Sequence, residues 1–255
     1  MHDVLPLSRR DTIAGRLALG QTVVAATLAA EFEVSEDAIR RDLRALAAEG
    51  KCRRVYGGAL PLSPGLLPMA ARIERAPERK LALARAAVSS IERGEFVFLD
   101  SGSTNLALVP LLPGDHGLTV ATNSIDIAAA MLGRGAIPLI VVGGSVDMTV
   151  GGSVDASAVA SIGQMNIDRC FIGACSISAA AGIGSFVHAD AIFKRSLLKR
   201  SRARVAMVTA DKVNECAPHR IGGPADLETV VVENDMPDDD REALAAAGFH
   251  VIHAS

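Results

Sequence analysis

The sequence predicts an α/β protein of two domains, a small helical domain with a basic hairpin and a larger domain in which strands and helices alternate. Residues 13–48 contain three short stretches with apolar residues at helical spacing, and the basic segment 51–58 follows them. From residue 95 onward, short apolar runs alternate with helix-like segments, which is the pattern of a mainly parallel sheet covered by helices. A length of 255 residues accommodates one small and one medium-sized domain.

The third helix of the small domain is predicted to begin after Ser35, a good N-cap residue. Glu36 and Asp37 place negative charge in its first turn, where the helix dipole favours it. One apolar stripe, spaced for a helix, must face a core; it consists of Ile39, Leu43 and Leu46.

The arginines of this helix occupy its other faces. Arg40 and Arg44 lie one turn apart, and Arg41 lies about a hundred degrees further round. A helix of this length fits the major groove of DNA, where guanidinium groups bond guanine edges or phosphates. The alternative is an ordinary surface helix with solvated arginines. DNA binding is favoured because residues 40–54 hold six Lys or Arg against two acids, counted along the sequence.

Two helices are expected upstream, one marked by Ile13 and Leu17 with Gly20 as its C-terminal stop. The other is marked by Val24, Leu28 and Phe32. Downstream, Cys52–Tyr56 is predicted to be a strand that ends in a turn at Gly57-Gly58. Three helices and this basic ribbon form a winged helix-turn-helix, in which Arg53 and Arg54 of the wing contact phosphates.

The domain limits follow from composition. Residues 61–70 are rich in proline and predict a semi-rigid linker, so we expect a DNA-binding domain at 1–60 and a second domain at 71–255. The net charge of −3 divides into +1 for residues 1–58 and −4 for the remainder. Basic character is therefore local, and the acidic balance elsewhere limits nonspecific binding to DNA.

Several classes of site are not indicated. The four cysteines have neither metal-ligand spacing nor a compelling disulfide pattern, so we expect no metal, no cofactor and free thiols. The sequence has no secretory signal and no run of about 20 apolar residues, so we expect a cytoplasmic protein without a membrane partner. P-loop and dinucleotide-binding glycine motifs are also missing.

The larger domain is expected to contain seven strands, each an apolar run: 95–99, 118–121, 137–142, 169–173, 203–209, 228–233 and 249–253. The run 137–142 (IPLIVV) is apolar enough to predict a strongly buried strand. Helices are expected at 104–112, 124–134, 189–202 and 238–247.

Small and polar residues follow four of these strands. The segments concerned are 100–105 (DSGSTN), 122–124 (TNS), 143–145 (GGS) and 173–174 (GA). In parallel sheets, ligands bind beyond the carboxyl ends of the strands, and hydroxyls and amides at a helix start suit a phosphate. Each loop alone could be ordinary helix capping. Together the four loops predict a ligand crevice.

The chain resembles the DeoR-type transcriptional regulators in two regions. The segment 34–59 carries that family's N-terminal signature, Ile39-Arg40-Arg41-Asp42-Leu43 followed by a wing that ends in Gly57-Gly58-Ala59. The stretches FVFLDSGSTN, LTVATNSIDIA, VVGGSV and CFIGACSISAAAGI look like the family's sensor domain. The resemblance implies a sensor fold similar to ribose-5-phosphate isomerase that binds sugar phosphates or related metabolites.

The resemblance also implies which residues bind the effector. They are Asp100, Ser101, Gly102, Ser103, Thr104, Thr122, Asn123, Gly143, Gly144, Lys194, Asp211 and Lys212, with Asp190 matching a family acid. We therefore expect a repressor that binds a double-stranded operator as a homodimer or homotetramer and responds to a sugar phosphate. No catalytic residue is expected.

The alternative is an isomerase-like enzyme that carries a DNA-binding domain. Asp100, Asp190, Lys194, Asp211 and Lys212 form a set of carboxylates and lysines that suits proton abstraction next to a carbonyl. A lysine beside a phosphate needs no catalytic explanation, and a shared fold does not transfer a reaction.

Overall fold

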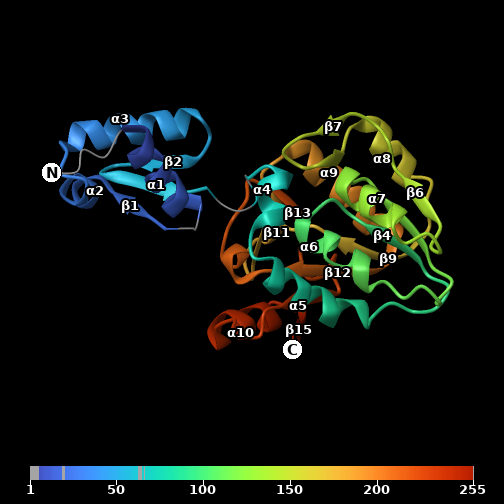
Figure 1. Ribbon diagram of the computed structural model, residues 1–255. Coiled ribbons are helices and arrows are strands. Elements are labelled where there is room, and N and C mark those ends of the chain that lie inside the picture. The colour runs from blue at the N-terminus through green and yellow to red at the C-terminus, as the bar shows by residue number, and fades with distance from the viewer. Residues whose placement is uncertain (1–5, 19–20, 63–64, 66, 255) are drawn as a thin grey trace. The chain divides into compact units, whose positions relative to one another are not determined.

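The computed structural model describes residues 6–18, 21–62, 65 and 67–254. The chain divides into two units, residues 1–63 and 64–255, and each has its own hydrophobic core. The first unit is a winged helix-turn-helix, and the second is built on a parallel sheet with helices on both faces (Figure 1). The expected fold class is confirmed.

The first unit packs three helices against a small antiparallel sheet of order β1-β3-β2. Its elements are α1 (Pro6–Ala18), β1 (Val23–Val24), α2 (Ala25–Glu31), α3 (Glu36–Ala48), β2 (Cys52–Val55) and β3 (Gly58–Pro61). Val24, expected on a helix, belongs to β1 and is half-exposed because it pairs with Gly58 instead of turning toward the core. The expected helix stop at Gly20 lies outside the described residues.

The second unit is built around seven parallel strands in the order β15-β14-β12-β9-β4-β5-β6. These strands are β4 (Phe96–Leu99), β5 (Thr119–Thr122), β6 (Leu139–Val141), β9 (Ile167–Ile172), β12 (Ser201–Val208), β14 (Thr229–Val232) and β15 (His250–His253). All seven overlap the apolar runs from which strands were predicted.

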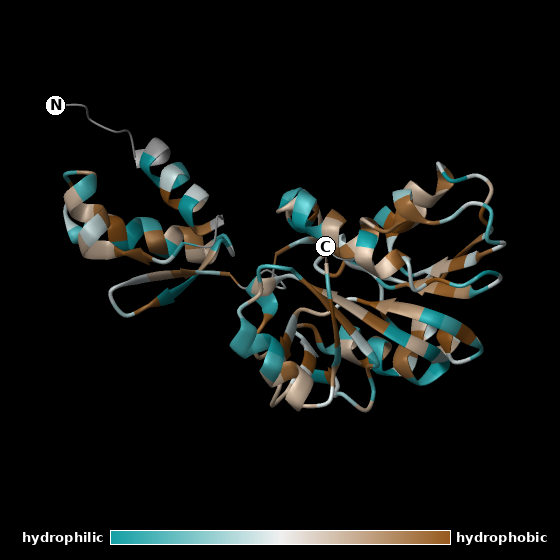
Figure 2. Cartoon of the chain, turned by 90° about the horizontal axis from the view of Figure 1, so that it is seen from below, coloured by the Kyte–Doolittle hydropathy of each residue, from teal (hydrophilic) through white to brown (hydrophobic). Residues whose placement is uncertain are grey.

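The helices of this unit form two layers. On one face α8 (Ala156–Ile162), α9 (His188–Arg200) and α10 (Asp238–Ala246) share a core with Phe98. On the other face α5 (Pro77–Val88), η2 (Val109–Leu111) and α7 (Ile125–Leu132) share a core with Val97 and Leu99. Alternate residues of β4 thus enter opposite cores, as the pleat of a strand requires. Figure 2 shows the resulting concentration of hydrophobic residues along the strands.

The strand expected to be strongly buried is an edge strand instead. Ile140 and Val141 of β6 are about half-exposed, at 43% and 50%. An apolar run identifies a strand but not its position, and β6 has a neighbour on one side only, β5. The prediction of burial was therefore wrong for Ile140 and Val141, whereas Ile137 and Val142 at the two ends of the run are buried.

The chain changes direction in the sheet between β4 and β9. It proceeds outward from β4 through β5 to β6, returns to β9 on the other side of β4, and continues to β12, β14 and β15. A crevice forms beyond the carboxyl ends of strands at such a switch point. The loops after β4 and β9 are therefore the places to look for a ligand.

The remaining elements lie around the carboxyl ends of the strands. They are α4 (Met69–Glu74), α6 (Ser103–Leu106), β7 (Val146–Asp147), β8 (Gly152–Ser153), β10 (Ser176–Ser178), β11 (Gly182–Ser185), η3 (Ala210–Lys212) and β13 (His219–Gly222). The antiparallel sheet β10-β11-β13 and the hairpin β7-β8 were not predicted, because their strands are short and rich in glycine and serine.

Ordered elements reach into both ends of the expected linker. Pro61 ends β3 and Met69 begins α4, while Ser63, Pro64 and Leu66 lie outside the described residues. Among the described residues, no helix has the length and apolarity needed to span a membrane.

Candidate nucleic-acid interface and ligand pocket

Helix α3 presents its arginines to solvent. The Ser35 hydroxyl caps the helix by accepting a hydrogen bond from the amide of Ala38 at 3.3 Å. The stripe of Ile39, Leu43 and Leu46 is buried in the core of the unit. Arg40, Arg41 and Arg44 are all exposed, so the sequence pattern assigned the two sides of this helix correctly.

The three arginines differ in what holds them. Arg40 pairs with Glu36 at 2.6 Å and with Asp37 at 3.2 Å. Arg41 donates to the backbone carbonyl of Asp37 at 3.3 Å. Within the described residues, Arg44 makes no ion pair and no side-chain hydrogen bond, so its guanidinium is free to meet a base edge or a phosphate.

The wing is a tight hairpin of β2 and β3 joined by Tyr56-Gly57. Gly57 has a φ of +81°, which only glycine adopts readily. Gly58 is required for a different reason: a Cβ there would lie 2.1 Å from the carbonyl oxygen of Val23. Arg53 and Arg54 are exposed along the wing.

Two features of this unit were not predicted. Tyr56 is fully exposed at the tip of the wing, where an aromatic ring on a surface suits contact with a partner. Asp42, which the charge count treats as a surface acid, is buried and pairs with Arg9 at 2.7 Å. This ion pair joins α1 to α3. A lone acid among arginines gives no sequence signal for such a role.

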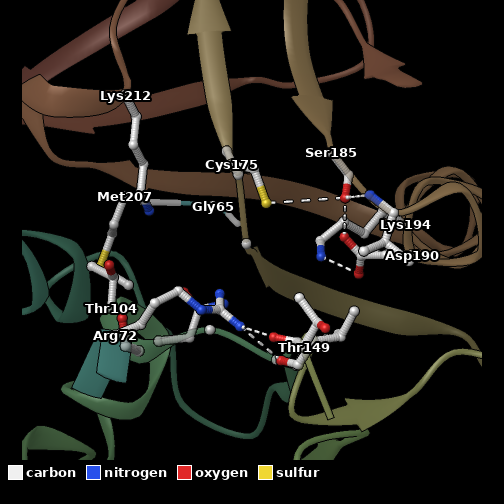
Figure 3. Close-up of a pocket in the computed structure, with 18 residues that line it drawn as sticks. Gly65, Arg72, Thr104, Thr149, Cys175, Ser185, Asp190, Lys194, Met207 and Lys212 are labelled. Carbon is white, nitrogen blue, oxygen red and sulfur yellow. Dashed lines mark hydrogen bonds and ion pairs between the residues drawn. The ribbon is translucent and has the colours of Figure 1, made fainter. Parts of the chain in front are cut away.

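The ligand pocket lies at the switch point of the parallel sheet (Figure 3). Its lining comes from the loop after β4, the loop after β9, the start of α9, η3, α4 and the β7-β8 hairpin. The lining residues are Gly65, Arg72, Ser101, Gly102, Ser103, Thr104, Asn105, Thr149, Val150, Gly173, Ala174, Cys175, Ser185, Val187, Asp190, Lys194, Met207 and Lys212.

The loop after β4 supplies two buried hydroxyl groups. Ser101 and Thr104 are nine-tenths or more buried, and within the described residues neither Oγ of Ser101 nor Oγ1 of Thr104 has a hydrogen-bond partner. The expected helix 104–112 is only the short α6 followed by the turn η2, whose second residue is Pro110. What this loop offers to a ligand is therefore a set of hydroxyl groups and not the dipole of a long helix.

A buried charge cluster forms one end of the pocket. Lys194 pairs with Asp190 on the same helix and with Asp100 at 3.3 Å, and the Ser185 hydroxyl donates to Asp190 at 2.6 Å. Burial alone lowers the pKa of Lys194, but the two carboxylates together outweigh burial and raise it. Burial also raises the pKa of Asp100, against the lowering effect of Lys194.

Some of the expected effector residues support the pocket from behind and do not line it. Asp100 accepts a hydrogen bond from the Gly173 amide at 2.8 Å, which links the loops after β4 and β9. Thr122 donates to the Leu99 carbonyl at 2.6 Å, and Asn123 accepts from the Ser101 amide at 3.0 Å. These contacts hold the loop in place, and Oδ1 of Asp100 is left without a hydrogen-bond partner among the described residues.

The expected effector residues that remain are Gly143, Gly144, Asp211 and Lys212, and of these Lys212 lines the pocket. Gly143 and Gly144 are exposed and are not among the lining residues, because the loop after β6 turns toward Asp155, which accepts from the Ser145 amide at 2.9 Å. Asp211 is paired with Arg75 at 3.3 Å. Lys212 does line the pocket, and burial lowers its pKa.

The structure also adds residues that sequence reasoning missed. Arg72 comes from α4, and its guanidinium donates to the carbonyls of Thr149 and Val150 at 2.8 and 3.0 Å. Gly65 packs so closely that a Cβ would lie 2.6 Å from Cβ of Cys175. Ser185 ends β11. None of these residues follows a strand of the main sheet, so the rule that selected the loops did not reach them.

Comparisons with known proteins agree with both parts of the structure. A family model described as a DeoR-like helix-turn-helix domain matches residues 9–64, and one described as the DeoR C-terminal sensor domain matches residues 75–234.

Relatives of known name cover most of the chain. The L-fucose operon activator of Escherichia coli K12 is 30% identical, over 84% of this chain and 90% of its own. The glycerol-3-phosphate regulon repressor of the same strain is 27% identical, over 82% and 84%. A solved structure, ribose 5-phosphate isomerase A of Methanocaldococcus jannaschii, covers 54% of each chain with 16% identity and a TM-score of 0.40. The family models together span most of the sequence, and the chain belongs to the DeoR family of DNA-binding transcriptional regulators.

Proposed function

We propose that this regulator is a repressor whose affinity for its operator is controlled by a phosphorylated sugar, or a related anionic metabolite, bound in the pocket at the switch point. One observation carries the effector side of the proposal. Ser101 and Thr104 line the pocket, and their hydroxyl groups are buried without a hydrogen-bond partner in the part of the chain that the structure describes.

A buried hydroxyl group without a hydrogen-bond partner lowers the stability of the folded protein. Leaving a buried polar group without a hydrogen bond costs about 1–3 kcal/mol, which a ligand with hydrogen-bonding oxygens recovers on binding. Phosphate and sugar hydroxyl groups both offer such oxygens. Lys212, Ser103 and the backbone of the same loop complete a surface suited to an anion.

On DNA, Arg40, Arg41 and Arg44 of α3 read the major groove, and Arg53 and Arg54 of the wing bind phosphates. One such unit covers a half-site, so two or four copies act together. The effector changes DNA affinity only to the extent that it prefers one of the two states of the regulator. The relatives of this chain include an activator and a repressor. Whether the effector raises or lowers the affinity for the operator is therefore measured directly.

The effector is tested by thermal unfolding of the full chain with a panel of sugar phosphates and their unphosphorylated parents. A ligand at about 100 times its dissociation constant stabilises by about 2.7 kcal/mol, a shift of a few degrees. We expect a shift with a phosphorylated sugar and a smaller one with its parent. Thr104→Val should reduce the shift. Thr119→Val, which changes the amino end of the neighbouring strand β5, should leave it intact.

Operator binding is then measured on DNA selected from a random pool with the full chain. A sugar phosphate that shifts the melting temperature should lower the affinity for that DNA. An effector that raises the affinity would contradict the repressor assignment. A panel without any shift would contradict the sugar-phosphate assignment.

The isomerase alternative would need a general base other than Lys194. Lys194 is held charged between Asp100 and Asp190, whereas a general base needs a pKa near the working pH. A coupled assay of pentose phosphate isomerisation tests it with the full chain. Turnover that is lost in Lys194→Met would favour the enzyme.

A further inference from the structure

One side of the second unit has a surface without exposed charge. Residues 125–166, which contain α7, β6, the β7-β8 hairpin and α8, include only four charged side chains in 42 positions, whereas 22% of the whole chain is charged. All four are half-buried: Asp126, Arg134, Asp147 and Asp155. The exposed side chains of this segment are therefore all uncharged, and we call them together the uncharged surface.

The charged groups of the segment bind backbone groups of their own unit. Arg134 donates to the carbonyl of Pro110 at 3.0 Å. Asp147 accepts hydrogen bonds from two amides of its own hairpin at 2.8 and 3.0 Å, and Asp155 caps helix α8. These charges serve the fold and leave the surface without charge.

The elements of the uncharged surface are joined to one another. The amide of Ile125, at the start of α7, donates to the carbonyl of Gly151 in the hairpin at 3.3 Å. The amide of Ser145, which follows β6, donates to Asp155 at the start of α8 at 2.9 Å. The segment therefore forms one continuous surface.

Large apolar side chains are concentrated on this surface. Six of the ten large hydrophobic residues that are exposed in the described part of the chain lie in this segment: Ile125, Leu132, Ile140, Val141, Val146 and Met148. Leu132 and Met148 are 77% and 80% exposed. An exposed apolar patch of this kind, free of charge, is typical of a surface that another protein covers.

The edge of the main sheet is open on the same side. The amide of Val142 donates to the Thr122 carbonyl at 2.8 Å, and the Pro138 carbonyl accepts from the Val120 amide at 2.9 Å. Backbone groups alternate in direction along a strand, so the amide and carbonyl of Val141 point away from β5. No strand of the described residues pairs with β6 on that side. Such an edge can pair with a strand of another chain.

The opposite edge of the sheet, formed by β15, has a different character (Figure 1). His250 and His253 are exposed at its two ends, and none of the exposed large hydrophobic residues of the described chain lies on β15. The apolar surface therefore belongs to the β6 edge and is not a general property of the sheet's margins.

The absence of charge favours a second copy of the same chain as the occupant. A two-fold interface brings the same surface of two copies face to face, so charges of one sign on it would repel each other. A surface without charge avoids this repulsion, and interfaces between identical subunits are apolar and poor in charged residues. DNA or a charged peptide would need opposite charges, which this surface does not offer.

We propose that the uncharged surface is the place where a second copy of this chain docks, through the same surface, with the two β6 edges facing each other. The need for a second copy rests on the proposed function, in which one DNA-binding unit covers a half-site. Docking buries Ile140 and Val141, the part of the apolar run that a single copy leaves exposed.

The surface is tested by sedimentation of the full chain over a range of protein concentrations. Leu132→Lys and Val141→Lys each place a charge in the interface, and we expect each to raise the dissociation constant of the dimer at least tenfold. Lysine is compatible with the last turn of α7 and with an edge strand, so the single copy should still fold, which its melting temperature checks. Ile192→Lys is the matched control, since Ile192 is an exposed apolar residue of α9 outside the surface. It should change the dissociation constant by less than twofold.

A second measurement locates the contact directly. Hydrogen exchange at the Val141 amide should slow as the protein concentration rises and the dimer forms. A native chain that sediments as a single copy at every concentration overturns the proposal. Dimers that persist in both lysine variants, with unchanged exchange at Val141, also overturn it, although copies could then still pair elsewhere as the proposed function requires.

Operator affinity separates the surface from the proposed function. A dimer lost in Leu132→Lys and Val141→Lys, together with weaker binding to the selected operator, supports both. A dimer lost in these variants with unchanged operator affinity upholds the surface and contradicts the paired action of the DNA-binding units.

Discussion

Arg44 and Arg40 occupy adjacent turns of α3, but the free protein prepares them differently. Arg40 must leave two exposed acids to reach DNA, and exposed pairs of this kind are worth about 0–1 kcal/mol. Within the described residues, Arg44 has no ion pair or side-chain hydrogen bond that binding to DNA would break. The two side chains are therefore expected to contribute unequally to DNA binding.

We predict that Arg44→Ala weakens binding to the selected operator by about 1–3 kcal/mol if it reads a base. Arg40→Ala should cost less, because in the native protein Arg40 must give up its ion pairs with Glu36 and Asp37 in order to contact DNA. Fluorescence anisotropy at fixed salt measures both, with Arg85→Ala in the second unit as the control. Operator affinity unchanged by Arg44→Ala would remove this residue from the interface.

Lys80, a buried residue of α5, lines a hollow beside the ligand pocket and gives anion binding there a pH dependence. Burial lowers its pKa to about 8, and an anion bound beside it raises that pKa, so affinity for a dianion should fall as pH increases through about 8. Lys212, whose pKa is also lowered, adds to this fall. The other charged groups that line the hollow of Lys80, between α4, α5 and η3, are Arg72, Arg75, Arg79, Asp211 and Lys212.

Sulfate is the suitable probe, since its charge does not change between pH 7 and pH 9.5. We expect the affinity of the native chain to fall over this range and the fall to be smaller in Lys80→Met. A fall of equal size in both proteins would show that Lys80 does not titrate at the anion.

At the scale of elements, the wing depends on a close approach of two strands. The backbone of Gly58 touches the Val23 carbonyl, so Gly58→Ala must push β1 and β3 apart. We predict a loss of about 1–3 kcal/mol in the stability of the first unit, typical of overpacking. Gly15→Ala is the matched control: nothing lies within 4 Å of an added Cβ in α1, and alanine favours a helix by about 0.5–1 kcal/mol. Chemical denaturation should show a loss of stability for Gly58→Ala and a gain for Gly15→Ala. Equal stabilities of the two variants would contradict the close approach of β1 and β3.

The elements also show what a single sequence can predict. All seven strands of the main sheet and the face of α3 were predictable, because apolar runs and helical spacing depend on residues that are neighbours in the chain. The edge position of β6 was not, since an apolar run does not state how many neighbours a strand has. Asp42, Arg72 and Lys80 were missed because their roles depend on partners that only the folded chain brings near.

At the scale of the whole molecule, each of the two units has a hydrophobic core of its own. We predict two unfolding transitions in calorimetry of the full chain. An anion or sugar phosphate should raise only the transition of the larger unit, while operator DNA should raise that of the smaller one. A single transition that moves with either ligand would contradict independent folding.

Gly65 is part of the pocket wall, packed against Cys175 and Phe186, and it also belongs to the stretch that joins the two units. With Gly65 held in place, three residues separate it from the end of β3, whereas seven separate β3 from the start of α4. When helix α3 of one protomer is bound to DNA, the number of residues that join the two units sets the effective concentration of the next protomer's helix at its half-site. Packing of Gly65 into the pocket wall, or its release from that wall, would therefore change the affinity for the operator, although every contact between protein and DNA stays the same.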